Sequence, residues 1–222
     1  MNYIYLVNTD KLNDEKLFSN YFSEMSDYRK AKIKKMKMQR DKNLSLGVGI
    51  LINDYLKTLG LREKDMLYEE KHNGKPFFKT LPNVYFNASH SGECAVCSFS
   101  DKEIGCDIEK SDKVNTKIAK RFFAQSESDY IFSVKTEAEQ SEIFFRLWTL
   151  KESYLKHSGK GLQGGLNSFE IVFDNGFANG IYLKEKGEIR KIYFKEYKYS
   201  DFYISVCSEN SMFSDDLIII NL

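Results

Sequence analysis

The segment GCDIE at residues 105–109 alternates acidic side chains with small or apolar ones. This alternation is typical of a β-strand that is buried on one side, because successive side chains of a strand point to opposite faces. Asp107 and Glu109 would leave the same face, while Cys106 and Ile108 enter the core. The segment therefore predicts a strand that carries two neighbouring carboxylates along one side.

The segment WTLKESYLK at residues 148–156 has the spacing of a helix. Trp148, Glu152 and Lys156 recur at every fourth residue and would share one helical stripe. Trp148 is the only tryptophan of the chain, and its presence indicates that this stripe is at least partly buried. A third carboxylate and a cation are thereby predicted on an element separate from the strand.

The three carboxylates Asp107, Glu109 and Glu152 form a candidate metal site. A hard cation such as Mg²⁺ takes a few carboxylate oxygens and fills its shell with water and substrate phosphates. The alternative is that the strand acids face solvent and that Glu152 pairs with Lys156 on a helix surface, a contact worth about 0.3–0.5 kcal/mol. Each acid taken alone favours this alternative, whereas the buried stripe favours the metal site.

The composition is that of an ordinary globular protein. The 222 residues are 42% hydrophobic and 29% charged, enough for one large domain or two small ones. The net charge of +1 gives no overall field toward nucleic acid or membrane. Residues 1–8 read as a strand and not as a signal peptide, and no stretch approaches the ~20 apolar residues of a membrane span. We therefore expect a cytoplasmic protein that binds neither membranes nor nucleic acid.

The four cysteines, Cys94, Cys97, Cys106 and Cys207, lie in apolar, strand-like surroundings. The C-x-x-C spacing of the first two could be half of a zinc site or a redox pair. The chain has no second C-x-x-C and no clustered histidines to accompany it. Because free cysteine commonly behaves as a small apolar core residue, we expect buried, reduced thiols.

Apolar periodicity and turn residues predict a mixture of helices and strands. Helices are expected at residues 27–38, 44–59, 115–123, from 126 onward and 137–157. Strands are expected at residues 3–8, 66–70, 76–78, 84–87, 94–99, 104–109, 168–173, 178–184, 190–198, 202–207 and 217–220. Asn73-Gly74 predicts a hairpin turn. Ser126 with Asp129 resembles a capping box.

Each half of the chain combines helices with antiparallel-looking strands. We therefore predict an α+β fold of two similar lobes, residues 1–103 and 104–222, with a cleft between them. Residues 100–103 contain no flexible linker, so the lobes should form one rigid monomer.

Three further segments could bind phosphate, and each has a simpler explanation. NASHSG at residues 87–92 reads as a polar turn whose backbone N–H groups and His90 could face a phosphate, or as a plain hairpin turn. GKP at residues 74–76 is a turn with a cation. The run RKAKIKKMKMQR at residues 29–40 predicts a basic helix, which is more often a solvated face than a phosphate site.

Taken together, these segments resemble a 4′-phosphopantetheinyl transferase of the larger, monomeric Sfp type, which activates carrier proteins of peptide and polyketide synthetases. The resemblance covers about residues 26–173 and rests on an ordered set of motifs. These are GKP at 74–76, FNASHS at 86–91, GCDIE at 105–109, IAKRFF at 118–123, WTLKESYLK at 148–156 and GKGL at 159–162.

The resemblance implies roles for individual residues. Asp107, Glu109 and Glu152 match the ligands of a Mg²⁺ ion that also binds the pyrophosphate of coenzyme A. Positions that match the binding of the 3′-phosphate and adenine side are Gly74, Lys75, Pro76, Ser89 and His90. Further cations that match phosphate contacts are Arg29, Lys32, Lys151 and Lys156. The arginine that the family places near Asn43 or Leu44 is missing, and Arg40 or Lys42 could substitute for it.

The implied reaction is transfer of phosphopantetheine from coenzyme A to a serine of an acyl or peptidyl carrier protein, with release of 3′,5′-ADP. Glu152 is the candidate base, and Lys156 would stabilise or protonate the leaving phosphate. Glu127 is an auxiliary metal acid or a helix cap, with the cap preferred.

The helix with Ile118, Ala119, Phe122 and Phe123 could dock the carrier, or simply face the core. The cations near it, Lys117, Lys120 and Arg121, would suit acidic carrier helices. Two rival functions remain: a non-catalytic coenzyme A or nucleotide-binding module, and a nucleic-acid-binding protein that uses the basic helix. Whether the carrier serves peptide, polyketide or fatty-acid synthesis stays open, as does Mg²⁺ against Mn²⁺.

Overall fold

The computed structural model describes residues 1–112, 116–159, 165–173 and 180–222. The helices are α1 (Glu15–Ser23), α2 (Asp27–Lys34), α3 (Gln39–Thr58), α4 (Thr116–Phe122), α5 (Gln125–Ser133) and α6 (Glu137–Ser158). The strands are β1 (Tyr3–Asn8), β2 (Tyr68–Glu70), β3 (Pro76–Phe78), β4 (Tyr85–Ser91), β5 (Cys94–Ser100), β6 (Ile104–Lys110), β7 (Phe169–Phe173), β8 (Ile181–Glu185), β9 (Glu188–Arg190), β10 (Tyr193–Tyr199), β11 (Phe202–Ser208) and β12 (Ile218–Ile220). Helices and mainly antiparallel strands confirm the predicted α+β class.

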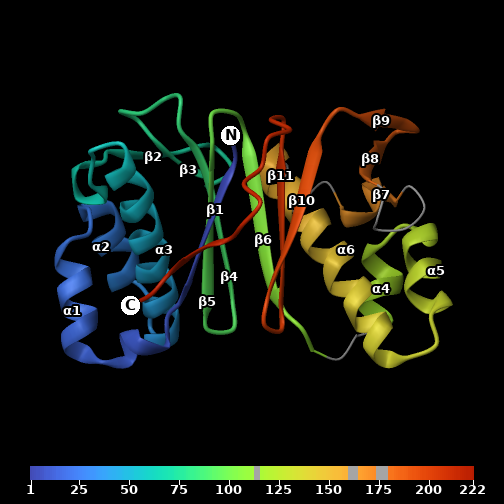
Figure 1. Cartoon of the computed structure of the whole chain (residues 1–222), viewed down its shortest axis with the longest axis horizontal. Helices are drawn as coiled ribbons and strands as arrows, with labels where there is room; N and C mark the ends of the chain where they lie inside the picture. Colours follow the sequence, from blue (N-terminus) through green and yellow to red (C-terminus); the bar gives the residue numbers. More distant parts are fainter. Residues whose placement is uncertain (113–115, 160–164, 174–179) are drawn as a thin grey trace.

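Two sheets lie between two groups of helices. The first sheet has the strand order β12-β1-β5-β4, and the second has the order β10-β11-β6. In Figure 1, α1–α3 lie on the outer side of the first sheet, and α4–α6 lie on the outer side of the second. Two smaller units, the β2–β3 hairpin and the β7-β8-β9 sheet, complete the described part.

Alternation along the strands divides the apolar side chains between these layers. Ile4 and Leu6 of β1 join Cys106 of β6 in one core between the two sheets. Val7 of β1 points the other way and packs in the core beneath α3. The acids of β6 leave on the face opposite Cys106, where α6 packs, as the GCDIE pattern predicts.

Helix α6 has a defined beginning and end. The Thr136 hydroxyl accepts a hydrogen bond from the Glu139 amide at 3.2 Å, and the Glu139 carboxylate accepts one from the Thr136 amide at 3.2 Å. At the other end, Gly159 adopts a left-handed conformation with φ of 67°. The predicted stop near Gly159 is therefore confirmed. Glu152 and Lys156 lie in the last two turns of this helix.

The predicted polar turn at residues 87–92 is wrong in extent. Strand β4 continues to Ser91, and the turn is confined to residues after it. Asn87, Ser89 and Ser91 stay extended because β4 pairs with β5 as far as Ser91, and their side chains hydrogen-bond to β6 of the other sheet. Polar residues that look like turn residues are here the inner face of a strand.

The predicted basic helix through residues 29–40 is divided in two. Helix α2 ends at Lys34, and α3 begins at Gln39 after Met38, whose backbone is extended (φ −84°, ψ 137°). This break turns the chain so that Ile33 of α2 and Leu46 of α3 enter the same small core. The single strand predicted at 190–198 is likewise two strands, β9 and β10.

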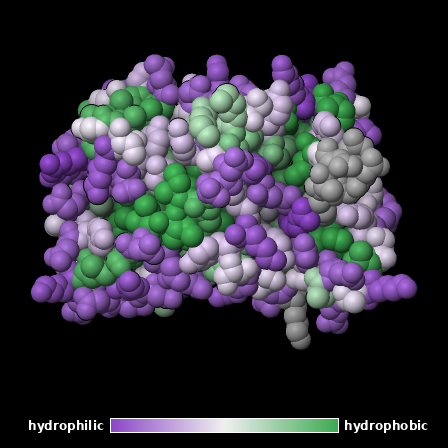
Figure 2. Space-filling view, viewed as in Figure 1, coloured by the Kyte–Doolittle hydropathy of each residue, from purple (hydrophilic) through white to green (hydrophobic). Residues whose placement is uncertain are grey.

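The last strand crosses the predicted boundary between residues 1–103 and 104–222. Strand β12 pairs in parallel with β1, with Ile218 opposite Tyr5 and Ile220 opposite Val7. The last residues therefore pack against the first sheet, where Ile218 and Ile220 are partly buried, and the division into two lobes stays a prediction. Figure 2 shows an apolar area where this segment crosses the first sheet, and Ile219 is 43% exposed.

Two other predictions concern the whole chain. All four cysteines are buried and unpaired, as expected. No helix within the described ranges combines the length and the apolar character that a membrane crossing requires. The helix predicted at 115–123 and the strand predicted at 178–184 begin outside the described residues, and the motif at 159–162 ends outside them.

Gly105 lets β6 approach α6 closely. A Cβ atom at this position would overlap the Ser153 carbonyl oxygen and the His157 amide nitrogen, both of which are backbone atoms of α6. We therefore expect Gly105→Ala to lower the free energy of unfolding in urea by about 3 kcal/mol. Gly49→Ala is the control, because its Cβ would meet the flexible end of Met25. Equal losses for the two variants would contradict this close approach.

Candidate active site

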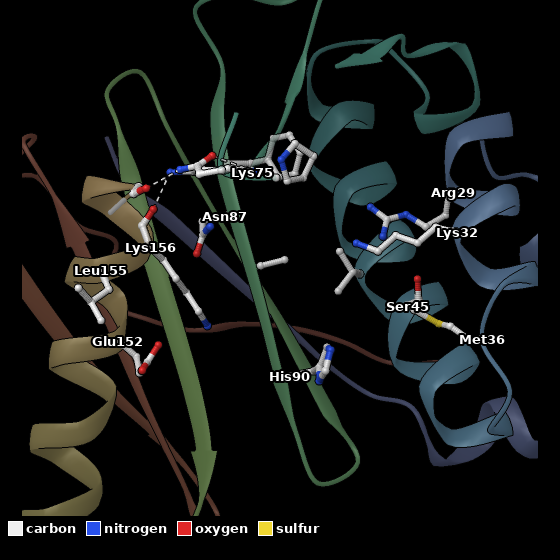
Figure 3. A pocket seen from close by; sticks show the side chains of 17 residues that line it. Arg29, Lys32, Met36, Ser45, Lys75, Asn87, His90, Glu152, Leu155 and Lys156 are labelled. Carbon is white, nitrogen blue, oxygen red and sulfur yellow. Dashed lines mark hydrogen bonds between the residues drawn. The ribbon is translucent and has the colours of Figure 1, made fainter. Parts of the chain in front are cut away.

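A pocket of about 370 Å³ lies between α2 and α3 on one side and α6 on the other. Figure 3 shows Arg29 and Lys32 pointing into it from α2, opposite Glu152 and Lys156 of α6, with His90 of β4 between them. The structure thus brings together many of the predicted site residues. Those that line the pocket are Arg29, Lys32, Gly74, Lys75, Pro76, His90, Glu152 and Lys156.

Strands β4 and β6 meet behind this pocket through side chains. The Asn87 side-chain oxygen accepts a hydrogen bond from the Cys106 amide at 2.9 Å. The Ser89 hydroxyl donates to Asp107 Oδ1 at 2.8 Å, and the Ser91 hydroxyl donates to a Glu109 carboxylate oxygen at 2.9 Å. The three partners follow one another along β6, at residues 106, 107 and 109, so this row of hydrogen bonds places both acids of that strand.

Lys156 is held on Asp107. Its ammonium donates to Asp107 Oδ1 at 2.6 Å and to the Ser89 hydroxyl at 2.7 Å. Burial lowers the pKa of Lys156, but the Asp107 carboxylate more than offsets this, so the pKa is raised and the side chain stays charged. Asp107 is 3% exposed, and its other oxygen, Oδ2, is buried with no hydrogen-bond partner among the described atoms.

The negative charge of Asp107 contributes to raised pKa values of the two remaining acids, Glu109 and Glu152. Burial raises the pKa of Glu109 to about 7, and repulsion from Asp107 adds to the shift. Burial, followed by Asp107, also raises the pKa of Glu152. Within the described ranges, however, no three His, Cys, Asp or Glu side chains are arranged to hold a metal ion. The sharing of one metal ion by Asp107, Glu109 and Glu152 therefore stays a prediction.

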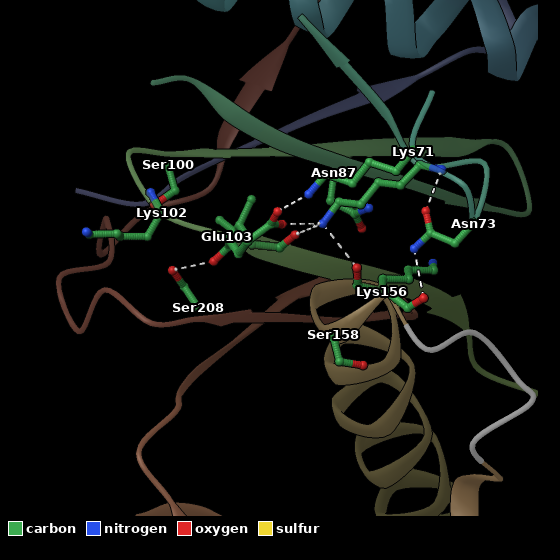
Figure 4. Close-up of polar contacts among 12 residues, drawn as sticks. Lys71, Asn73, Asn87, Ser100, Lys102, Glu103, Lys156, Ser158 and Ser208 are labelled. Carbon is green, nitrogen blue, oxygen red and sulfur yellow. Dashed lines mark hydrogen bonds and ion pairs between the residues drawn. The ribbon is translucent and has the colours of Figure 1, made fainter. Parts of the chain in front are cut away.

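The Lys75 side chain is largely buried, and its ammonium already has hydrogen-bond partners within the protein. Its ammonium donates to a Glu103 carboxylate oxygen at 3.0 Å, to the Ile104 carbonyl at 2.8 Å and to the Lys156 carbonyl at 3.1 Å (Figure 4). These three bonds use all the N–H groups of a lysine. A phosphate at Lys75 would have to replace one of them. Glu103 also pairs with Lys71, and sequence reasoning singled out neither residue.

The opposite wall of the pocket is cationic. Arg29 is 3% exposed although it lines the pocket. Burial, and then the neighbouring Arg29, lowers the pKa of Lys32. Burial and Lys156 lower the pKa of His90, so this imidazole is neutral near pH 7. Ser45 of α3 also lines the wall, and its buried hydroxyl has no partner among the described atoms. No motif pointed to Ser45.

Lys151 is a predicted ligand-binding cation that lies away from the pocket. Its side chain is fully buried, and its ammonium donates to both Glu127 oxygens at 2.6 and 2.7 Å and to the Phe169 carbonyl. Glu127 also accepts a hydrogen bond from the Ala124 amide at the start of α5, so the preferred capping role is present. The capping box predicted from Ser126 is not, because α5 begins at Gln125. Lys151 comes one residue before Glu152, off the stripe of every fourth residue, and its side chain faces the core.

The structure also shows where Arg40 and helix α4 lie. Arg40, a candidate for the missing arginine, donates to the Gly92 carbonyl at 2.8 Å and is not part of the pocket wall. Ala119 of α4 and Phe123, just after that helix, are buried in the core with α6, which agrees with the simpler expectation of a core-facing helix.

Comparison with known proteins identifies the family. The sequence model of the 4′-phosphopantetheinyl transferase superfamily matches residues 103–207. The chain is 34% identical to the 4′-phosphopantetheinyl transferase gsp of Aneurinibacillus migulanus over 88% of this chain and 81% of that protein. It is 29% identical to the 4′-phosphopantetheinyl transferase Sfp of Bacillus subtilis strain 168, over 98% and 97% of the two chains. The chain belongs to the 4′-phosphopantetheinyl transferase superfamily.

His157, one turn past Ser153 on α6, should make stability depend on pH. Burial lowers its pKa from 6.5 to about 4, with Lys75 adding to the effect, and neither ring nitrogen has a hydrogen-bond partner in the described part. The folded state therefore binds fewer protons than the unfolded state between these values. We expect stability to fall by up to about 3 kcal/mol as the pH drops from 6.5 to 4.

Urea unfolding at a series of pH values tests this expectation. His157→Gln should lose that part of the pH dependence, whereas His72→Gln, at an exposed turn position, should retain it. If wild type and His157→Gln have the same pH dependence, His157 is not the residue responsible.

Proposed function

We propose that this protein transfers 4′-phosphopantetheine from coenzyme A to a serine hydroxyl of an acyl or peptidyl carrier protein and releases 3′,5′-ADP. One observation supports the proposal most strongly. A single pocket has the cations Arg29 and Lys32 on one wall and the pair Glu152 and Lys156 on the other, beside the acids of β6. Such a pocket suits a ligand with several phosphates and a reaction at one of them. The curated relatives described above carry the name of this activity.

The residues around the pocket have different roles in binding the substrate. Arg29 and Lys32 supply charge for the phosphates, and the neutral His90 can donate one hydrogen bond between them. Gly74 and Pro76, on either side of Lys75, shape the end of the pocket at the β2–β3 turn. Ser89 acts indirectly, because its hydroxyl holds both Asp107 and Lys156 in place.

Asp107, Glu109 and Glu152 are the residues that we propose to hold a magnesium ion. The unpartnered, buried Oδ2 atom of Asp107 supports this, as do the raised pKa values of the two glutamates. A divalent cation would relieve the repulsion that raises them, and carboxylate oxygens suit Mg²⁺. When bound, the ion would neutralise negative charge on the pyrophosphate of coenzyme A.

The transfer itself exchanges one phosphorus–oxygen bond for another. The serine oxygen attacks the β-phosphorus of coenzyme A, and the bond to the 5′-phosphate of 3′,5′-ADP breaks, with the electron pair leaving on that phosphate. The serine proton passes to the Glu152 carboxylate, which lines the pocket beside Lys156. Lys156 stays charged and stabilises the leaving phosphate without having to give up a proton.

One chain supplies both walls of the pocket, so we propose that the protein acts as a monomer. We also propose that it works in the cytoplasm, with coenzyme A and a carrier protein as its partners. The net charge of +1 supports the exclusion of nucleic acid and membrane surfaces as partners.

The direct test incubates the protein with Mg²⁺, coenzyme A and an apo carrier protein, followed by intact-mass measurement of the carrier. Carriers of peptide, polyketide and fatty-acid synthesis are compared in parallel, and Mn²⁺ replaces Mg²⁺ in a second series. A gain of the phosphopantetheine mass supports the proposal. If coenzyme A binds in calorimetry but no carrier gains mass, the protein is a coenzyme A-binding module and not a transferase.

Glu152→Gln keeps the size of the side chain and removes its charge. We expect kcat for carrier modification to fall by at least about 100-fold, because the proton acceptor and one proposed metal ligand are lost. Glu142→Gln is the control, since Glu142 lies on the same helix and pairs with Arg146 at the surface. Substantial turnover by the Glu152 variant would remove this residue from the mechanism.

Lys156→Met tests the stabilisation of the leaving phosphate. We expect kcat to fall more than the affinity for coenzyme A, because the charge of Lys156 matters most when the phosphate leaves. Calorimetry gives the affinity, and initial rates with saturating coenzyme A give kcat. A loss confined to affinity would show that Lys156 only binds the substrate.

A further inference from the structure

A fully buried carboxylate lies behind the cationic wall of the pocket. Glu63, in a 3₁₀ turn (η2, Glu63–Asp65), is 0% exposed. Its carboxylate accepts hydrogen bonds from the Ser26 amide at 2.6 Å, the Ser26 hydroxyl at 2.8 Å and the Tyr68 hydroxyl at 2.8 Å. One acid thereby joins the start of α2, the 3₁₀ turn and strand β2.

Glu63 forms an ion pair with Arg29. Arg29 Nε lies 3.9 Å from Glu63 Oε1 and has no hydrogen-bond partner among the described atoms. Both side chains of this pair are almost completely buried, with 4% and 0% exposure. A guanidinium taken out of water needs a nearby negative charge, because its desolvation is otherwise costly. Glu63 supplies that negative charge, and it does so from behind Arg29, because Arg29 lines the pocket and Glu63 does not.

Glu63 also holds the backbone from which Arg29 projects. Ser26 is the N-cap of α2, and its hydroxyl accepts a hydrogen bond from the Arg29 amide at 3.2 Å. The Tyr28 ring stacks on Tyr68 with centroids 4.6 Å apart, which ties the same turn of α2 to β2. The orientation of Arg29 therefore depends on one carboxylate in two ways, through its charge and through the capped turn.

We propose that Glu63 is a positioning residue for the ligand-binding Arg29. Glu63 keeps one edge of the guanidinium and the first turn of α2 in place, so that the rest of Arg29 meets a phosphate group of the substrate. Glu63 is not part of the pocket wall, so it acts through Arg29. This inference rests on the proposed function, in which the phosphates belong to coenzyme A.

The test is a double-mutant cycle between Glu63 and Arg29. Glu63→Gln preserves size but lacks the charge, and its amide N–H groups face the donors of Ser26. We expect KM for coenzyme A to rise about tenfold with kcat changed less than twofold. In an Arg29→Gln background, Glu63→Gln should add nothing further to KM. The control Glu69→Gln, which removes a surface carboxylate paired with Lys79, should keep the wild-type KM.

Two results would overturn the inference: an unchanged KM in Glu63→Gln, or the same tenfold rise in the Arg29→Gln background. If Glu63→Gln only weakened the fold in general, its effect would not depend on Arg29, and the same rise in KM would occur in the Arg29→Gln background. If Glu63→Gln does not fold, Glu63→Asp takes its place. That variant keeps the charge but shortens its reach, and its smaller rise in KM should again vanish in the Arg29→Gln background.

The dissociation constant of coenzyme A, measured by calorimetry, should follow the same pattern without any transfer reaction. This readout separates the two claims. A wild-type protein that binds coenzyme A but modifies no carrier refutes the proposed transferase and leaves the role of Glu63 to be decided by the binding cycle. A wild-type protein that modifies carriers, with affinity unchanged in Glu63→Gln, refutes only the role of Glu63.

Discussion

The arrangement of the site depends on a row of hydrogen bonds between β4 and β6. Asn87, Ser89 and Ser91 reach across from β4 with short polar side chains, and their partners are the amide of Cys106 and the two acids of β6. This row lies between the edge strands of the two sheets. Since α6 packs directly on β6 at Gly105, any slip along the row would move the acids and α6 together.

The cations of the pocket share a second constraint. Lys156 is paired with Asp107, Lys75 with Glu103 and Arg29 with Glu63. Each carboxylate offsets part of the cost of taking a cation out of water, and each fixes the direction in which that cation points. Lys75 in addition donates to the Lys156 carbonyl near the end of α6, where a positive charge is favourable. The pocket can thus be cationic in a chain whose net charge is only +1.

Patterns along the chain predicted the elements that bear the chemistry. The alternation in GCDIE identified β6 and its polar face. The four-residue spacing of Trp148, Glu152 and Lys156 identified the stripe of α6 whose last two residues line the pocket. The errors came from polar residues whose partners are distant in sequence. The residues at 87–92 were read as a turn because their hydrogen-bond partners on β6 cannot be seen locally. The basic run from Arg29 was read as a solvated helix because its counter-charge, Glu63, lies in another element.

By itself, the sequence predicted most of the helices and strands, the polar face of β6, the positions of Glu152 and Lys156 on α6, and the family to which the chain belongs. These properties follow from short-range periodicity and from ordered motifs. Only the tertiary structure decided which charges are available to a ligand. Lys151 and Lys156 are both lysines of α6, yet one is buried on Glu127 and the other faces the pocket beside Asp107. Their different roles arise from packing against distant strands, because burial and pairing of a charge are properties of the folded chain.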